Sequence, residues 1–160
     1  MRPILIIEDN EQKYLAIESS LKQALDVDVY RARTVRSAYN LIENNSWAAL
    51  VLDMTFEDAE GLLRTTSKKP LAGIEVLQFI AGSNLKLPTL VVTQHDQFAV
   101  KGHGASLTLE ELRELLSEAF PVQCLGVVRS RLGESDSDWL EQITLTLKGA
   151  LVEENQNIVR

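Results

Sequence analysis

The sequence has little of what marks secreted, membrane-bound or nucleic-acid-binding proteins. Cys124 is the only cysteine among 160 residues, so no intrachain disulfide can form and the reducing cytoplasm is the expected location. The apolar runs have the length of strands and are too short to cross a bilayer. Basic residues number 16 against 23 acidic ones, and the net charge of −7 disfavours nucleic acids and anionic membranes as partners.

Glycine and proline are also scarce, with 8 and 4 residues, which excludes collagen-like and linker-like chains. Apolar residues make up 45% of the chain and charged residues 24%, as in ordinary globular proteins. The length corresponds to about one domain at roughly 150 residues per domain. We expect this domain to span residues 1–152, followed by a polar tail over 153–160.

Five short segments are rich in apolar residues. Four of them are nearly continuous, which is typical of strands covered by helices on both faces, and one alternates with polar residues as an edge strand does. The predicted strands are residues 4–7, 27–32, 48–52, 89–93 and 124–128, with the alternating segment at 27–32.

The segments between these strands carry apolar residues at helical spacing, which predicts an inward-facing apolar stripe on each. The predicted helices cover residues 14–25, 35–42, 74–81, 109–120 and 140–151. Thr108 and Glu111 have the spacing of a capping box at the start of the fourth helix. Strand and helix alternate five times, so we predict an α/β, doubly wound (βα)5 domain of flavodoxin-like type, with a parallel sheet between two helical layers.

Two connections are longer than the roughly 2–6 residues that such units need. They cover about residues 55–72 and 94–107, and we expect both to be loop insertions. Each one leaves the carboxyl end of a predicted strand. In open parallel sheets this is the end at which ligands bind.

Acidic residues follow the first and third predicted strands. Glu8 and Asp9 come directly after residues 4–7, and Asp53 comes directly after residues 48–52. Parallel neighbouring strands would bring these three carboxylates together, and their mutual repulsion would raise at least one pKa. Mg²⁺ relieves such repulsion and prefers oxygen ligands, so the pattern predicts a magnesium site suited to phosphoryl chemistry. The simpler alternative is that Asp9 or Asn10 only caps the following helix.

Four motifs make the sequence similar to the receiver domain of bacterial two-component response regulators, over nearly the whole chain. They are Ile6-Ile7-Glu8-Asp9-Asn10, Leu52-Asp53-Met54, Gly73-Ile74-Glu75-Val76-Leu77 and Val91-Val92-Thr93.

This resemblance implies a role for each matching residue. Asp53 would be the phospho-acceptor, and Glu8 and Asp9 would hold Mg²⁺ together with Asp53 and the backbone carbonyl of Thr55. Thr93 would contact the phosphoryl group. The implied protein is a stand-alone signalling module, with no enzymatic activity beyond its own phosphorylation. Its partners would be a histidine kinase or other phosphodonor and a downstream protein.

The sequence departs from the family pattern after the fifth predicted strand. The family has a lysine there, usually followed by proline, whereas Val128 is followed here by Arg129-Ser130-Arg131. Arg129 is the candidate substitute, and Lys68 or Lys69 of the first insertion is another. Gly126 stands about where the family carries a switching aromatic residue. These departures leave open a pseudo-receiver that binds partners without being phosphorylated.

A Mg²⁺-dependent phosphohydrolase of the haloacid-dehalogenase type is the alternative from another functional class. Its sheet also places a nucleophilic aspartate after a strand. That motif requires a second aspartate two residues later as general acid, and Thr55 stands at this position. The sequence therefore favours the signalling module.

Overall fold

The computed structural model describes residues 1–57, 68–69, 71–99, 106–133 and 138–158. At its centre lies a five-stranded parallel sheet with the strand order β2-β1-β3-β6-β9. The strands are β1 (Ile4–Ile7), β2 (Val29–Ala32), β3 (Ala49–Leu52), β6 (Thr89–Thr93) and β9 (Cys124–Arg129). The chain order reverses between β1 and β3, as expected for a doubly wound sheet.

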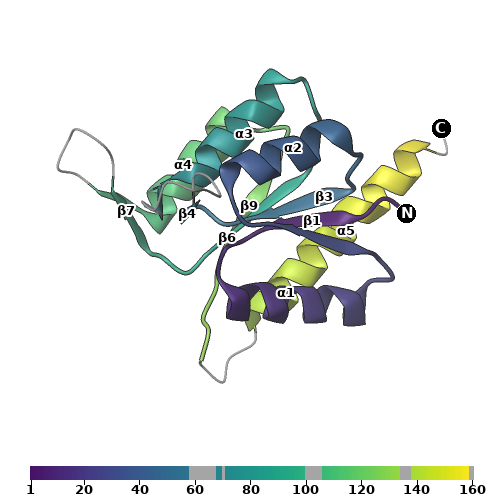
Figure 1. The fold of residues 1–160 in the computed structure, drawn as a ribbon, viewed down its shortest axis with the longest axis horizontal. Helices are drawn as coiled ribbons and strands as arrows, with labels where there is room; N and C mark the ends of the chain where they lie inside the picture. Colours follow the sequence, from purple (N-terminus) through teal and green to yellow (C-terminus); the bar gives the residue numbers. More distant parts are fainter. Residues whose placement is uncertain (58–67, 70, 100–105, 134–137, 159–160) are drawn as a thin grey trace.

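Helices cover both faces of this sheet (Figure 1). One layer holds α1 (Glu11–Ala24) and α5 (Asp138–Ile158), and the other holds α2 (Val35–Asn44), α3 (Ala72–Gly82) and α4 (Leu109–Ala119). The predicted α/β doubly wound fold is confirmed, and each of the five predicted helices is present.

Each central strand contributes to two separate cores because successive side chains point to opposite faces of the sheet. In β1, Ile4 and Ile6 belong to the core under α1 and α5, while Leu5 and Ile7 belong to the core under α2, α3 and α4. All four side chains are fully buried. This two-sided burial explains why the strands appear in the sequence as continuous apolar runs.

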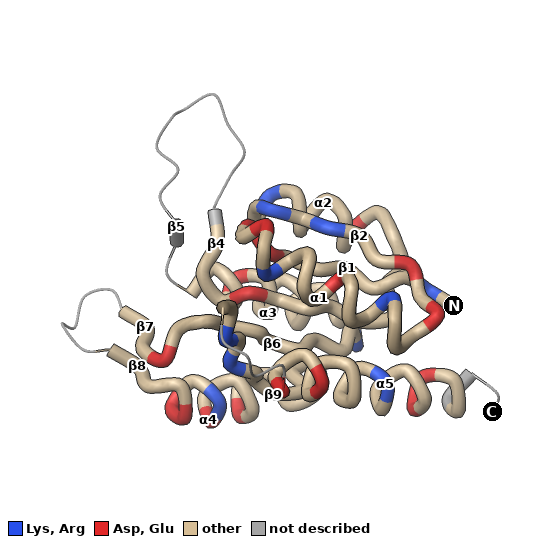
Figure 2. The backbone as a smooth tube through the Cα atoms, turned by 90° about the horizontal axis from the view of Figure 1, so that it is seen from below, with Lys and Arg blue, Asp and Glu red and all other residues tan. Residues whose placement is uncertain are grey.

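The two long insertions begin and end in short antiparallel pairings that the sequence did not lead us to expect. β4 (Phe56–Glu57) pairs with β5 (Lys68–Lys69), and β7 (Gln97–Ala99) pairs with β8 (Ser106–Thr108). Phe56 and Phe98 are buried in the core under α2, α3 and α4, which fixes one strand of each pair. Residues 58–67, 70 and 100–105 of the insertions lie outside the described part of the chain. Figure 2 shows both pairs at the end of the molecule away from the termini.

Helix α5 continues through Ile158, so the expected boundary between domain and tail at residue 152 falls inside a helix. Leu147 and Leu151 of this helix are buried against the sheet. None of the described helices combines the length and apolar character that a membrane span requires.

Candidate functional site

The three acidic residues meet at the carboxyl ends of β1 and β3. Ile7 and Leu52 are register partners, so Glu8 and Asp53 follow directly from paired positions. The Asp53 backbone N–H donates to the Ile7 carbonyl at 3.0 Å, which continues the pairing by one residue. One carboxylate oxygen from each of Glu8, Asp9 and Asp53 lies within 4.8 Å of the others. The convergence predicted from the sequence is therefore present.

Asn10 is the residue that caps α1. Its side-chain oxygen accepts a hydrogen bond from the backbone N–H of Lys13 at 2.9 Å, and its backbone is extended. This is the usual geometry of an N-cap. Because Asn10 caps the helix, capping does not account for the presence of Asp9 or Glu8 in the cluster.

A buried lysine that the sequence analysis missed lies among these carboxylates. The Nζ of Lys13 is 2.6 Å from Oε2 of Glu8 and 3.2 Å from Oδ1 of Asp53. It also donates to the carbonyl of Val92 in β6 at 2.7 Å. The Lys13 side chain is 1% exposed. An ammonium group has three N–H donors, so these contacts use its whole hydrogen-bonding capacity.

The spacing of the buried residues in α1 explains why Lys13 faces the sheet. Lys13, Ile17 and Leu21 follow one another at intervals of four residues, and all three are buried. Residues four apart lie on the same face of a helix. The sequence does contain a signal for this buried lysine. Lys13 stands at the first position of the apolar stripe of α1, about one turn after the acidic residues that follow β1.

Burial and mutual repulsion set the electrostatics of the cluster. Desolvation by burial, opposed by Lys13 and reinforced by the nearby Asp53, raises the pKa of Glu8 to about 7. Burial also raises the pKa of Asp53, against the attraction of Lys13. Both oxygens of Glu8 have partners, because Oε1 accepts the backbone N–H of Asn10 at 3.0 Å. The Oδ1 atom of Asp53 accepts the backbone N–H of Met54 at 2.8 Å.

Several solved structures that resemble this chain are receiver domains. Neither a family model nor a curated protein matches the sequence. The receiver domain of a Francisella response regulator superimposes with a TM-score of 0.64 at 12% identity, covering 96% of this chain and 99% of that one. A response regulator receiver domain protein from Clostridium thermocellum gives 0.64 at 14% identity, with 98% of each chain covered. The non-phosphorylated HemR receiver domain from Leptospira biflexa gives 0.62 at 19% identity, with 94% of each chain covered.

The chain has the receiver-domain fold. These likenesses extend over nearly the full length of this chain and of the solved structures.

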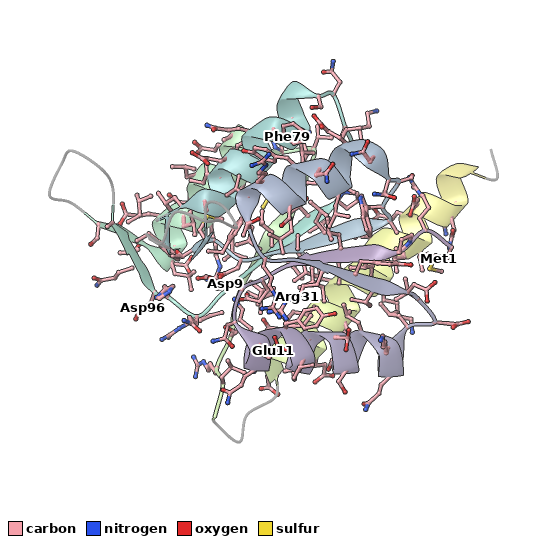
Figure 3. The ribbon with its side chains drawn as sticks, viewed as in Figure 1. Met1, Asp9, Glu11, Arg31, Phe79 and Asp96 are labelled. Atoms are coloured by element: carbon pink, nitrogen blue, oxygen red, sulfur yellow. The ribbon has the colours of Figure 1, made fainter. Side chains whose placement is uncertain are left out.

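Arg31 supports the acidic end of this receiver fold from the neighbouring strand β2. Its Nε donates to the Glu8 carbonyl at 3.0 Å, and its guanidinium pairs with Glu11 at 2.5 Å. The guanidinium also lies over the Tyr14 ring, 4.3 Å from the centroid. Figure 3 shows Arg31 beside Glu11, with Asp9 at the same end of the sheet, opposite Met1. These contacts fix the backbone that carries the Glu8 carboxylate.

Thr93 and Arg129 lie at the ends of the neighbouring strands β6 and β9 and are register partners. The Thr93 side chain is buried, and its hydroxyl oxygen accepts the backbone N–H of His95 at 3.2 Å. The guanidinium of Arg129 pairs with Asp96 at 3.7 Å. Within the described part of the chain, the cation in contact with Asp53 is Lys13, contributed by α1.

The remaining residues predicted for the receiver site are Thr55, Lys68 and Lys69. Thr55 is half-buried and lies between Met54 and the start of β4. The backbone of Lys68–Lys69 forms β5, and the side chains of both lysines lie outside the described part of the structure.

The chemical type of the candidate ligands fits a magnesium ion. Three carboxylates with oxygens within 4.8 Å of one another supply the hard ligands that Mg²⁺ requires. Two of these carboxylates, Glu8 and Asp53, already contact the Lys13 ammonium. A metal ion at this site would share its ligands with a cation that belongs to the chain.

Proposed function

We propose that this protein is a receiver-like signalling module that accepts a phosphoryl group on Asp53 and passes its state to a partner protein. A histidine kinase or another phosphodonor would supply the group. The single cysteine and the acidic charge suit a protein working in the cytoplasm through protein contacts.

The observation that carries the proposal is the convergence of Glu8, Asp9 and Asp53 at the carboxyl end of a receiver fold. Asp53 directly follows β3 at the point where the strand order reverses, which is where open α/β sheets bind ligands. Thr93, at the end of the adjacent strand β6, supplies a hydroxyl on the same edge of the sheet.

The proposed step is a nucleophilic displacement at phosphorus. A carboxylate oxygen of Asp53 forms the new bond to phosphorus, and the bond from phosphorus to the donor breaks, with the leaving group taking the electron pair. Lys13 would hold the Asp53 carboxylate in position through its contact at 3.2 Å. Thr93 would donate a hydrogen bond to the transferred group, and Arg129 remains a candidate for pairing with it.

Glu8, Asp9, Asp53 and the Thr55 carbonyl would hold Mg²⁺. When bound there, the ion would neutralise charge on the phosphoryl oxygens. In the absence of the ion, Lys13 already compensates part of the carboxylate charge.

Labelling with radioactive acetyl phosphate in the presence of MgCl2 tests this function. We expect wild-type protein to take up label in an acyl phosphate, which alkali hydrolyses, and Asp53→Asn to take up none. Asp26→Asn is the matched control, because Asp26 is exposed in the segment between α1 and β2, and this variant should label like the wild type. Wild type without label, or equal label on Asp53→Asn, contradicts the proposal.

A second candidate is a pseudo-receiver that binds its partner without phosphorylation. Two contacts favour it: Asp53 already has a cationic partner in Lys13, and Arg129 pairs with Asp96. The same labelling experiment separates the two candidates, because the pseudo-receiver takes up no label although it is folded.

A further inference from the structure

The Lys13 ammonium lies where a bound divalent cation would find its carboxylate ligands. It contacts Oε2 of Glu8 at 2.6 Å and Oδ1 of Asp53 at 3.2 Å, and both side chains are almost fully buried. We propose that Lys13 is a built-in cation that competes with divalent metal for these two carboxylates and thereby weakens metal binding at the site.

The distances make the two cations competitors. Magnesium holds oxygen ligands at about 2.0–2.1 Å. A metal ion bound to Oε2 of Glu8 would therefore lie within about 5 Å of the Lys13 nitrogen if the ammonium kept its contact with the same oxygen. Two positive charges at this separation repel each other strongly in a site screened from water. Metal binding to Glu8 and Asp53 thus requires the ammonium to move away or to remain at an energetic cost.

Lys13 has few alternatives to its present position. Its third contact is the Val92 carbonyl at 2.7 Å, and its side chain is 1% exposed. An ammonium displaced from both carboxylates would keep this one neutral partner inside the protein. Leaving a buried charge without its counter-ion is strongly unfavourable. The cost of displacing Lys13 therefore subtracts from the affinity of the site for metal.

Substitution of Lys13 by methionine tests the inference, because methionine keeps most of the side-chain length and removes the charge. Titration calorimetry with MgCl2 should show at least about tenfold tighter binding to Lys13→Met than to wild type, which corresponds to about 1.4 kcal/mol. Adding Asp53→Asn to Lys13→Met should abolish the gain, because the metal loses a ligand.

Lys22→Met is the matched control. Lys22 lies on the same helix, but it is exposed and pairs with Glu18 at 3.7 Å, away from the acidic cluster. This variant removes the same charge from α1, so it should bind magnesium as the wild type does. Equal tightening by Lys22→Met would mean that overall charge, and not the position of Lys13, determines the affinity, and the inference would be wrong.

Circular dichroism keeps the test decisive if Lys13→Met folds poorly. Without the ammonium, the three carboxylates repel one another, so the apo variant should melt at a lower temperature than wild type. MgCl2 should raise its melting temperature by more than it raises that of wild type, whereas NaCl of equal ionic strength should not. The polar neutral variant Lys13→Gln should behave in the same way. Absence of magnesium rescue in both variants overturns the inference.

This inference rests on the metal-binding part of the proposed function and not on phosphorylation. Equal affinity of wild type and Lys13→Met, or no binding by either, overturns the inference. If Lys13→Met binds magnesium more tightly but the wild type takes no label from acetyl phosphate, the inference is supported. The proposal that Asp53 accepts a phosphoryl group is then contradicted. Failure of this inference and failure of the proposed phosphorylation therefore give different experimental results.

Discussion

Gly73 is the position where the site depends on the absence of a side chain. A Cβ atom added there would lie 2.7 Å from the Asp53 carbonyl oxygen and 3.1 Å from the Met54 Cα. Both are backbone atoms, which cannot move aside as a flexible side chain can. The Gly73 N–H also donates to the Met54 carbonyl at 3.1 Å. Helix α3 can therefore begin close to the backbone of Asp53 only if it carries glycine at this position.

Replacement of Gly73 by alanine should destabilise the fold by about 1–3 kcal/mol, because the added methyl overpacks a buried contact. Urea unfolding measures this change. Gly82→Ala in the same helix is the matched control, since its Cβ would meet no atom within 4 Å. The control should leave stability unchanged or raise it by up to about 1 kcal/mol. If both variants unfold at the same urea concentration, the close approach at Gly73 does not limit stability.

At the residue scale, the sequence predicted the acidic cluster but not its internal cation. Glu8, Asp9 and Asp53 follow recognisable strands, so their convergence depends only on the sheet order. Lys13 was missed because the helix was identified from its apolar residues alone. The four methylene groups of a lysine side chain can extend along an apolar face while the ammonium group reaches a polar site. Lys13 therefore occupies a position in the apolar stripe of the helix at which the periodicity predicts an apolar residue.

At the scale of elements, the cap of α1 determines where Lys13 lies. The Asn10 side chain accepts the backbone N–H of Lys13, so the residue that starts the helix is bonded to the residue that enters the site. The N–H of Asn10 in turn donates to Oε1 of Glu8. Strand end, cap and lysine thus form one connected unit.

Removal of this cap by Asn10→Ala should lower the free energy of unfolding by about 0.5–2 kcal/mol, whereas Asn10→Ser, which keeps a capping oxygen, should lose far less. Chemical denaturation gives both values. Asn44→Ala, near the exposed end of α2, is a control that removes an asparagine outside any N-cap. A loss for Asn10→Ser as large as that for Asn10→Ala would show that the cap oxygen is not what Asn10 contributes.

The helices and the strands of the parallel sheet could be predicted because the apolar residues of each one follow a single regular pattern. The strand pairings inside the insertions could not be predicted. β1 coincides with the predicted segment 4–7, and the capping box of Thr108 and Glu111 is present at α4. The β4–β5 and β7–β8 pairs contain strands of two or three residues. Alternation over so few positions gives no periodic signal. Their buried anchors, Phe56 and Phe98, become visible only when the core is known.

At the scale of the whole molecule, the sheet couples two cores that share no helix. The core under α2, α3 and α4 contains Trp47, and the core under α1 and α5 contains Trp139. Both indole rings are buried, and the Nε1 of Trp47 donates to the Leu41 carbonyl at 2.9 Å. Strands β1, β3 and β6 contribute side chains to both cores. Neither core can lose its sheet face while the other remains intact.

This arrangement predicts that both faces unfold together. In Trp139→Phe the remaining fluorescence reports on the core under α2, α3 and α4, and in Trp47→Phe it reports on the core under α1 and α5. Within each variant, the urea midpoint from fluorescence should coincide with the midpoint from far-ultraviolet circular dichroism, as two-state unfolding requires. A fluorescence midpoint below the dichroism midpoint in only one variant would mean that one helical layer separates first and that the shared strands do not couple the two cores.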